Sequence, residues 1–168
     1  MKNAFEEEFL YSLKVLDFCH YYKVPSPPPR SRLTRFYTPR PYDFILVKDG
    51  VFCALELKYT NKEAAYPLSK FPPYQIEGLR GAKRNGGLAI VVINIRKRNP
   101  RVIKAFAFDF AEIEALLQNG KASIPKDMLL SGYQVPREKT EKGRYIWRVD
   151  LLFQHFKEKC LAQIAIGK

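Results

Sequence analysis

The stretch PYDFILVKDGVFCALELKYTNK, residues 41–62, decides the fold of this chain. It contains two runs rich in Val, Ile, Phe and Tyr, from Tyr42 to Lys48 and from Val51 to Lys58, which are typical of β-strands. Asp49-Gly50 separates the runs and is the two-residue signal of a tight hairpin turn. Apolar residues occur on both faces of each run, so we expect a sheet covered on both sides.

The length of the turn decides which residues face one another across this hairpin. With a two-residue turn, Lys48 pairs with Val51, and counting back along both strands brings Asp43 opposite Glu56. Their Cβ atoms would then lie roughly 4.5–5.5 Å apart. Lys58 lies two residues beyond Glu56 and so points to the same face. A turn longer by one residue would send one carboxylate to the other face.

The chemistry of this carboxylate pair points to a metal site. Opposed buried carboxylates repel each other and raise a pKa, and a divalent cation removes the repulsion. Mg²⁺ binds one or two carboxylates and takes further ligands from water and phosphate, where it activates water and stabilises the leaving oxygen. Lys58 would stabilise charge at phosphorus or orient the attacking water. The ordinary alternative is an exposed Glu56–Lys58 ion pair with Asp43 at the strand edge.

A first helix is predicted over residues 4 to about 20, because apolar residues recur on one face from Phe5 to Leu16. Glu6 falls inside this apolar stripe, where a glutamate needs a partner. The metal held by the hairpin carboxylates is one candidate partner. The alternative is that Glu6 lies at a frayed helix start and interacts with the helix dipole.

The remaining pattern predicts an α/β fold class, a three-layer domain with a mixed central sheet flanked by helices, over residues 1–168. The expected elements are an extended basic connector over 25–41, a loop over 61–71, a helix over about 74–83, a strand over 88–95, a basic loop over 96–98, a strand over 102–108, a helix over 111–118, mostly loop over 119–141, an edge strand over 145–149 and a helix over 151–161.

Gln75 lies on the sheet-facing side of the helix over about 74–83. There it would orient water, contact phosphate or be an ordinary satisfied polar group.

The net charge of +12 and a pI near 9.7 favour a polyphosphate partner such as DNA. Acidic lipid is the rival partner, but no basic helix with a clean apolar face is present. From Lys23 to Lys48 there are six basic residues and one acid, Asp43. An ordinary solvated surface is the alternative explanation for these charges. The residues expected to contact phosphate are Arg30, Arg32, Arg35, Arg40, Arg80, Lys83, Arg84, Arg96, Lys97 and Arg98.

Composition also bounds the setting in which the chain works. The longest apolar run, Leu88 to Ile93, is far too short to cross a bilayer. Glu6, Glu7 and Glu8 stand where an export signal would carry Lys or Arg. The three cysteines show no CxxC spacing, so we expect small buried residues in a reducing compartment rather than zinc ligands. We therefore expect a cytoplasmic protein without membrane association.

Pro41-Tyr42-Asp43 followed by Glu56-Leu57-Lys58 resembles the PD-(D/E)xK nuclease signature. Three longer segments are more specific, and in order and spacing they resemble the RecU-type Holliday junction resolvases. The resemblance implies a restriction-endonuclease-like core and a homodimeric, structure-selective endonuclease that requires Mg²⁺. Whether Mn²⁺ substitutes for Mg²⁺ stays open at this point. The three segments are PYDFILVKDGVFCALELKYTNK, YPLSKFPPYQIEGL and GGLAIVVINI.

Carried over residue by residue, the resemblance assigns catalytic and metal-binding roles. Glu6 matches the acid on the first helix, with Glu7 and Glu8 as neighbouring alternatives. The catalytic residues implied are Asp43, Glu56, Lys58 and Gln75, and the metal-binding residues implied are Glu6, Asp43, Glu56 and Leu57. One departure is the short connector over 25–41, because the family usually has a longer basic stalk there that enters the junction. A compact form with a shortened stalk keeps the charge but not the reach.

The function expected is a Mg²⁺-dependent endodeoxyribonuclease that cuts four-way DNA junctions, with two identical subunits providing paired cuts. Two alternatives remain open. One is a nuclease of the same core that acts on linear duplex DNA, of restriction, repair or phage type. The other is a DNA-binding module without catalysis, in which Asp43 and Glu56 are relics. The complete set of acids, lysine and glutamine speaks against this last reading.

Overall fold

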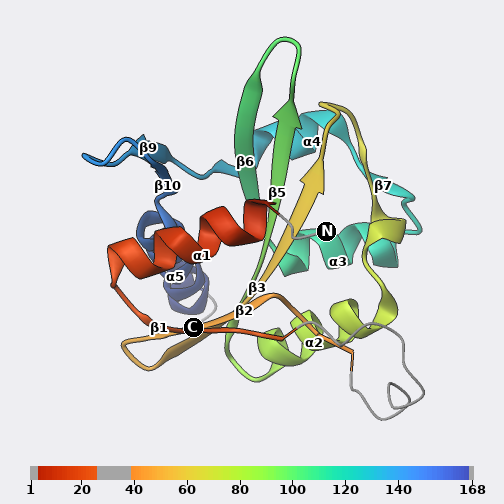
Figure 1. Ribbon diagram of the computed structural model, residues 1–168. Coiled ribbons are helices and arrows are strands. Elements are labelled where there is room, and N and C mark those ends of the chain that lie inside the picture. Colours follow the sequence, from red (N-terminus) through yellow and green to blue (C-terminus); the bar gives the residue numbers. More distant parts are fainter. Residues whose placement is uncertain (1–3, 26–38, 167–168) are drawn as a thin grey trace, which may run out of the picture.

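The computed structural model describes residues 4–25 and 39–166, and a mixed six-stranded sheet forms its centre (Figure 1). Strands β3 and β5 are parallel, and every other neighbouring pair in this sheet is antiparallel. The prediction of a mixed sheet is therefore confirmed. In spatial order the strands are β1 (His20–Lys23), β2 (Phe44–Lys48), β3 (Val51–Thr60), β5 (Leu88–Lys97), β6 (Val102–Asp109) and β8 (Tyr133–Gln134).

Helices cover both faces of this sheet and make a three-layer molecule (Figure 1). On one face lie α1 (Ala4–Leu16) and α5 (Val149–Ile166), and on the other lie α2 (Pro73–Arg84), α3 (Phe110–Gln118) and α4 (Lys126–Ser131). Two small two-stranded sheets complete the fold. They pair β4 (Tyr66–Pro67) with β7 (Ser123–Ile124), and β9 (Arg137–Lys139) with β10 (Tyr145–Trp147), and a short 3₁₀ helix spans Leu68–Lys70.

The strand hairpin at the centre follows the register expected from its turn. Lys48 pairs with Val51, and the ladder continues to Phe44 opposite Leu55. Asp49 and Gly50 have φ angles of 52° and 74°, which a two-residue hairpin turn with left-handed residues requires. Alternate residues of the hairpin enter two separate cores, one beneath α1 and α5 and the other beneath α2 and α3. The expectation of a sheet covered on both sides is confirmed.

The first helix ends earlier than predicted, at Leu16 instead of about residue 20. Asp17 adopts a φ of 42°, and its N–H donates to the Leu13 carbonyl at 3.2 Å. Aspartate tolerates this left-handed conformation, which closes a helix without the usual glycine. The residues that follow form β1, an edge strand that pairs with β2.

Three further expectations from the sequence were wrong. Arg96 and Lys97 belong to β5, so the expected basic loop over 96–98 keeps only Arg98 at the turn. The stretch 119–141 contains β7, α4, β8 and β9 and is not mostly loop. Residues 145–147 pair with β9 in a separate small sheet and are not an edge strand of the main sheet.

A close contact positions the second helix against the segment that leads into the hairpin. A Cβ atom at Gly78 would collide with the side chain and backbone of Pro41, whereas one at Gly81 would meet nothing within 4 Å. Gly78 therefore lets α2 approach the chain just before Asp43. Within 4–25 and 39–166, none of the helices is both long and apolar enough to span a bilayer.

Candidate active site

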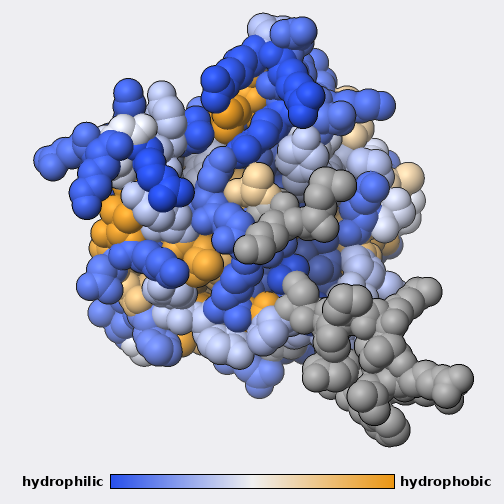
Figure 2. Space-filling view, viewed as in Figure 1, coloured by the Kyte–Doolittle hydropathy of each residue, from blue (hydrophilic) through white to orange (hydrophobic). Residues whose placement is uncertain are grey.

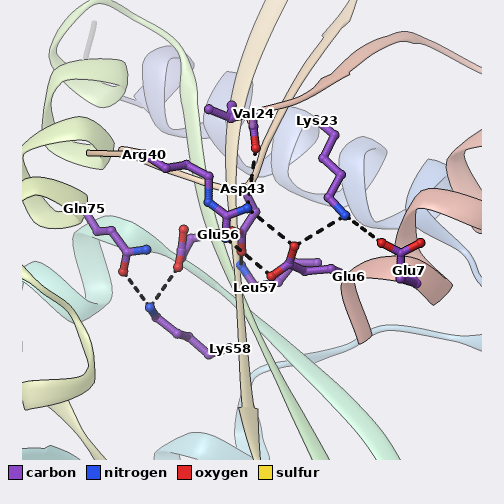
Figure 3. A network of polar contacts seen from close by, with 10 residues as sticks. All are labelled: Glu6, Glu7, Lys23, Val24, Arg40, Asp43, Glu56, Leu57, Lys58 and Gln75. Carbon is purple, nitrogen blue, oxygen red and sulfur yellow. Dashed lines mark hydrogen bonds and ion pairs between the residues drawn. The ribbon is translucent and has the colours of Figure 1, made fainter. Parts of the chain in front are cut away.

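Glu56 and Lys58 lie on β3, on the side of the sheet that α2 covers (Figure 3). The Lys58 ammonium donates to Gln75 Oε1 at 2.6 Å and forms an ion pair with Glu56 Oε1 at 2.8 Å. The Glu56 side chain is 2% exposed and that of Lys58 is 12% exposed. This pair is therefore buried, unlike the exposed surface pair considered as the ordinary alternative.

Asp43 immediately precedes β2 and is held by the backbone of the partner strand. Its N–H donates to the Leu55 carbonyl at 2.9 Å, and its Oδ2 accepts from the Leu57 N–H at 2.7 Å. Asp43 is 1% exposed. Among the described residues, Asp43 Oδ1 and Glu56 Oε2 are buried acceptors without a hydrogen-bond donor.

The Arg40 guanidinium lies between Asp43 and the first helix (Figure 3). It forms an ion pair with Asp43 Oδ1 and lies 3.4 Å from Glu6 Oε1. Lys23 reaches the same glutamate, with its Nζ 3.5 Å from Glu6 Oε2, and also contacts Glu7 at 3.0 Å. The glutamate on the core face of α1 thus has two basic partners.

Electrostatics of the site favour an added positive charge. Burial raises the pKa of Asp43, against the opposing effect of Arg40, and Glu6 raises it further. Burial also raises the pKa of Glu56, and the nearby Asp43 carboxylate adds to the rise. Burial opposes the charge on Arg40, but the Asp43 and Glu6 carboxylates outweigh it and raise the pKa of Arg40. Two carboxylates that resist ionisation together are a site for a cation.

The donor set fits one divalent cation. Asp43 and Glu56 each present a buried oxygen that accepts no hydrogen bond from residues 4–25 or 39–166, and Mg²⁺ in proteins takes one or two carboxylates. No three Asp, Glu, His or Cys side chains among residues 4–25 and 39–166 are grouped so as to hold a metal. The structure thus brings together Asp43, Glu56, Lys58 and Gln75, while Glu6 contacts Arg40. Leu57, also assigned to the metal, contributes its N–H to Asp43.

Several basic residues expected at DNA are engaged by carboxylates. On α2, Arg80 contacts Glu114 at 2.6 Å and also pairs with Glu77. Lys83 Nζ lies 2.5 Å from Asp109 Oδ2. Arg84 is more exposed, with its guanidinium 4.0 Å from Glu77. Glu77 of α2, Glu114 of α3 and Asp109 at the end of β6 therefore neutralise part of the charge on this helix.

The basic residues of the β5–β6 hairpin differ from one another. Arg96 contacts Glu8 at 2.7 Å, and Lys97 contacts Glu63 at 3.2 Å. Arg98 is exposed and makes no ion pair in the described part of the chain. Figure 2 shows mostly hydrophilic residues on this projecting hairpin, around a small hydrophobic patch, and on the β9–β10 hairpin. The expected contacts Arg30, Arg32 and Arg35, with most of the connector over 25–41, lie outside the described residues.

Two contacts, one in the site and one outside it, were not found from the sequence. Arg40 was assigned to DNA, but in the structure it pairs with Asp43, three residues along the chain. Glu8, which lies off the apolar stripe, accepts from the Trp147 indole N–H at 3.2 Å as well as pairing with Arg96. The one sequence signal for the first contact is that Asp43 is the lone acid among six basic residues.

Comparison with known proteins shows which family this chain resembles. Residues 20–150 match the model of the family described as Recombination protein U. The Holliday junction resolvase RecU of Levilactobacillus brevis is 27% identical over 118 residues, which cover 70% of this chain and 59% of the relative. That of Bacillus pumilus is 29% identical over 118 residues, covering 70% and 56%. This chain thus spans less than two thirds of the length of these relatives.

A solved structure supports the fold independently. Hjc of Archaeoglobus fulgidus, a Holliday junction resolvase from an archaeal hyperthermophile, aligns with a TM-score of 0.50 at 19% identity. The alignment covers 77% of this chain and 91% of Hjc. At this identity the likeness concerns the fold, and the family model covers most of the chain, including the whole hairpin and α2. The chain therefore belongs to the Recombination protein U family.

Proposed function

We propose that this protein is a Mg²⁺-dependent endonuclease that cuts four-way DNA junctions. One observation carries the proposal: Asp43, Glu56 and Lys58 converge in a buried site, where two carboxylate oxygens receive no hydrogen bond from the described part of the chain. Family membership supports the substrate, because both curated relatives are named Holliday junction resolvases. The basic surface supports DNA over a small substrate, since the chain carries a net charge of +12.

Each side chain of the site has a distinct task in this proposal. Asp43 and Glu56 hold the cation, with Asp43 oriented by the Leu57 N–H. When bound, a divalent cation polarises the phosphate and lowers the pKa of a water molecule. Lys58 lies beside Glu56, where it stabilises negative charge that develops on the phosphate oxygens. Gln75 accepts from Lys58 and fixes the direction of its ammonium group.

The test is cleavage of a labelled four-way junction and of the matching linear duplex, with Mg²⁺ or with EDTA. We expect paired nicks in the junction that require the metal. Asp43→Asn and Glu56→Gln should abolish cutting but keep junction binding, because phosphate contacts and metal chemistry use different residues. Asp127→Asn, which removes an exposed carboxylate on α4, is the matched control and should cut normally.

Other outcomes would assign a different function. Equal cutting of both substrates would retain the nuclease and remove the preference for junctions, as expected for an enzyme of linear duplex DNA. Tight binding without cutting by the wild-type protein would indicate a DNA-binding module. Normal cutting by Asp43→Asn would contradict the site itself.

We further propose that the active species is a homodimer, because paired cuts across a junction need two sites. Sedimentation of the protein alone and with an uncut junction in Ca²⁺ would measure this. A complex with two chains for each junction supports the proposal, and paired cutting by a strictly monomeric species would contradict it.

A further inference from the structure

Arg40 occupies a particular place in the proposed active site. Its guanidinium pairs with Asp43 Oδ1, the same oxygen that has no hydrogen-bond donor among the residues the structure describes, and it also lies beside Glu6 (Figure 3). The side chain is only 16% exposed, and it acts electrostatically on Glu56 as well. One positive charge therefore faces three carboxylates.

The fit between this arginine and the carboxylates is incomplete. The ion pair with Asp43 Oδ1 lacks hydrogen-bond geometry, and Glu56 Oε2 has no donor at all among the described residues. Arg40 thus supplies charge without satisfying either oxygen. A cation that bound both oxygens would provide what the guanidinium does not, and two positive charges on one oxygen would repel each other.

We propose that Arg40 is the resident counter-ion of the metal site, and that a divalent cation must displace it from Asp43 in order to bind. This inference rests on the proposed function. Because the cation must break the ion pair between Arg40 and Asp43, the protein binds the cation less tightly than it would without Arg40. The arginine gives the carboxylates a positive partner whenever the metal is absent.

Glu6 receives a role in the same arrangement. It comes from α1 and lies next to the guanidinium at 3.4 Å, and its side chain is 13% exposed (Figure 3). When Arg40 leaves Asp43, it keeps Glu6 as its ion-pair partner, and the Val24 carbonyl lies 3.5 Å away. Glu6 is then a positioning residue for Arg40 rather than a ligand of the metal.

Calorimetric titration of the full chain with Mn²⁺, in the absence of DNA, tests the displacement directly. Arg40→Gln should bind Mn²⁺ more tightly than wild type, on the order of tenfold, because the competing charge is gone. Lys23→Gln is the matched control, since Lys23 also pairs with Glu6 but has no contact with Asp43. Arg40→Lys keeps the charge and should bind the metal more weakly than Arg40→Gln.

The comparison of the two neutral variants decides the proposal. A gain in affinity for Arg40→Gln that clearly exceeds the gain for Lys23→Gln supports it. An equal gain would reduce Arg40 to a general positive charge. Unchanged binding would show that Arg40 does not compete with the metal, and weaker binding would show that it assists the metal. Each of these three results overturns the proposal.

A second measurement does not depend on any variant. The side-chain N–H resonance of Arg40, followed by NMR in the wild-type protein, should shift as Mg²⁺ is added and saturate together with metal binding. A resonance that stays unchanged at saturation would refute displacement. Failure of the proposed function would give a different result from failure of the displacement. The wild-type protein would then bind no Mn²⁺, or would bind Mn²⁺ with the same affinity as Asp43→Asn.

Discussion

The Lys58 ammonium group forms an ion pair with Glu56 and donates a hydrogen bond to Gln75. The glutamine is hydrogen-bonded to Lys58 and to neither Asp43 nor Glu56, so its effect on the reaction passes through the lysine. Its amide oxygen fixes where the ammonium group points. The role of Gln75 can therefore be separated from the binding of metal.

Gln75→Ala should lower the cleavage rate by roughly 10–100-fold, the usual cost of losing a residue that orients an active group. Mn²⁺ affinity should remain at the wild-type value, because both carboxylates are untouched. Single-turnover cleavage and calorimetry measure the two quantities. Gln118→Ala, at an exposed position at the end of α3, is the control and should change neither. A loss of metal affinity would place Gln75 among the metal-holding groups.

The raised pKa values of Asp43 and Glu56 predict how stability depends on pH without metal. The folded protein holds these protons more tightly than the unfolded chain, so their contribution is fully present below the ordinary carboxyl pKa of about 4 and is lost as the pH rises toward neutrality. Glu56→Gln should become progressively more stable than wild type over that range. Urea unfolding of both proteins in EDTA measures the difference, and a constant difference would contradict the pKa shift.

Metal should reverse this loss in the wild-type protein. Protons and the cation compete for the same carboxylates, so Mg²⁺ should raise the melting temperature more at pH 8 than at pH 5. Thermal unfolding at the two pH values tests this, and Asp43→Asn should show little response to Mg²⁺ at either.

Among the elements, α2 depends on a close contact with the chain before β2. Gly78→Ala should destabilise the fold by about 1–3 kcal/mol, because the new methyl group would collide with Pro41. Gly81→Ala on the same helix should instead stabilise it by about 0.5–1 kcal/mol, since alanine favours the helix and nothing lies nearby. Chemical denaturation of the two variants gives the comparison. Equal effects would show that the contact with Pro41 does not hold α2.

The elements that could be predicted from the sequence are those with a strong local signal. The turn at Asp49-Gly50 set the register of β2 and β3, and Pro73 marked the start of α2. The end of α1 was missed because neither glycine nor proline occurs between Ala4 and Val24, and Asp17 closes the helix. The short elements within 119–141 have too few residues for a periodic pattern.

The same distinction applies to the site. Asp43, Glu56 and Lys58 follow from strand alternation and turn length, so the sequence was enough to place them on one face. The position of Arg40 depends on how the chain before β2 packs against α1, and no local pattern reports such a contact. The metal was one candidate partner of Glu6 and the helix dipole the alternative, and the structure places Arg40 and Lys23 beside this glutamate.

For the whole molecule, the charge of +12 predicts DNA binding that weakens steeply with salt. The basic residues should contribute unequally to this salt dependence. Arg98→Gln should reduce the slope of log K against log salt concentration by about 1, because this exposed residue has no acidic partner in the described regions. Arg80→Gln should change the slope little, since Glu77 and Glu114 already neutralise Arg80.

Fluorescence anisotropy with a labelled junction in Ca²⁺, over a range of salt concentrations, measures these slopes. A flat salt response of the wild-type protein would contradict a phosphate-binding surface. Equal changes for Arg98→Gln and Arg80→Gln would show that the ion pairs on α2 open when DNA binds.

The residues proposed for catalysis lie close together along the chain. From Asp43 on the hairpin to Gln75 on α2, one uninterrupted segment carries both carboxylates, the lysine and the glutamine that orients it. Their mutual placement is set by one turn and one crossover from β3 to α2. In evolutionary terms, such a segment can be inherited as a unit. Insertions, deletions and exchanges on either side of it would then alter the surface that grips DNA without moving the residues proposed here for catalysis.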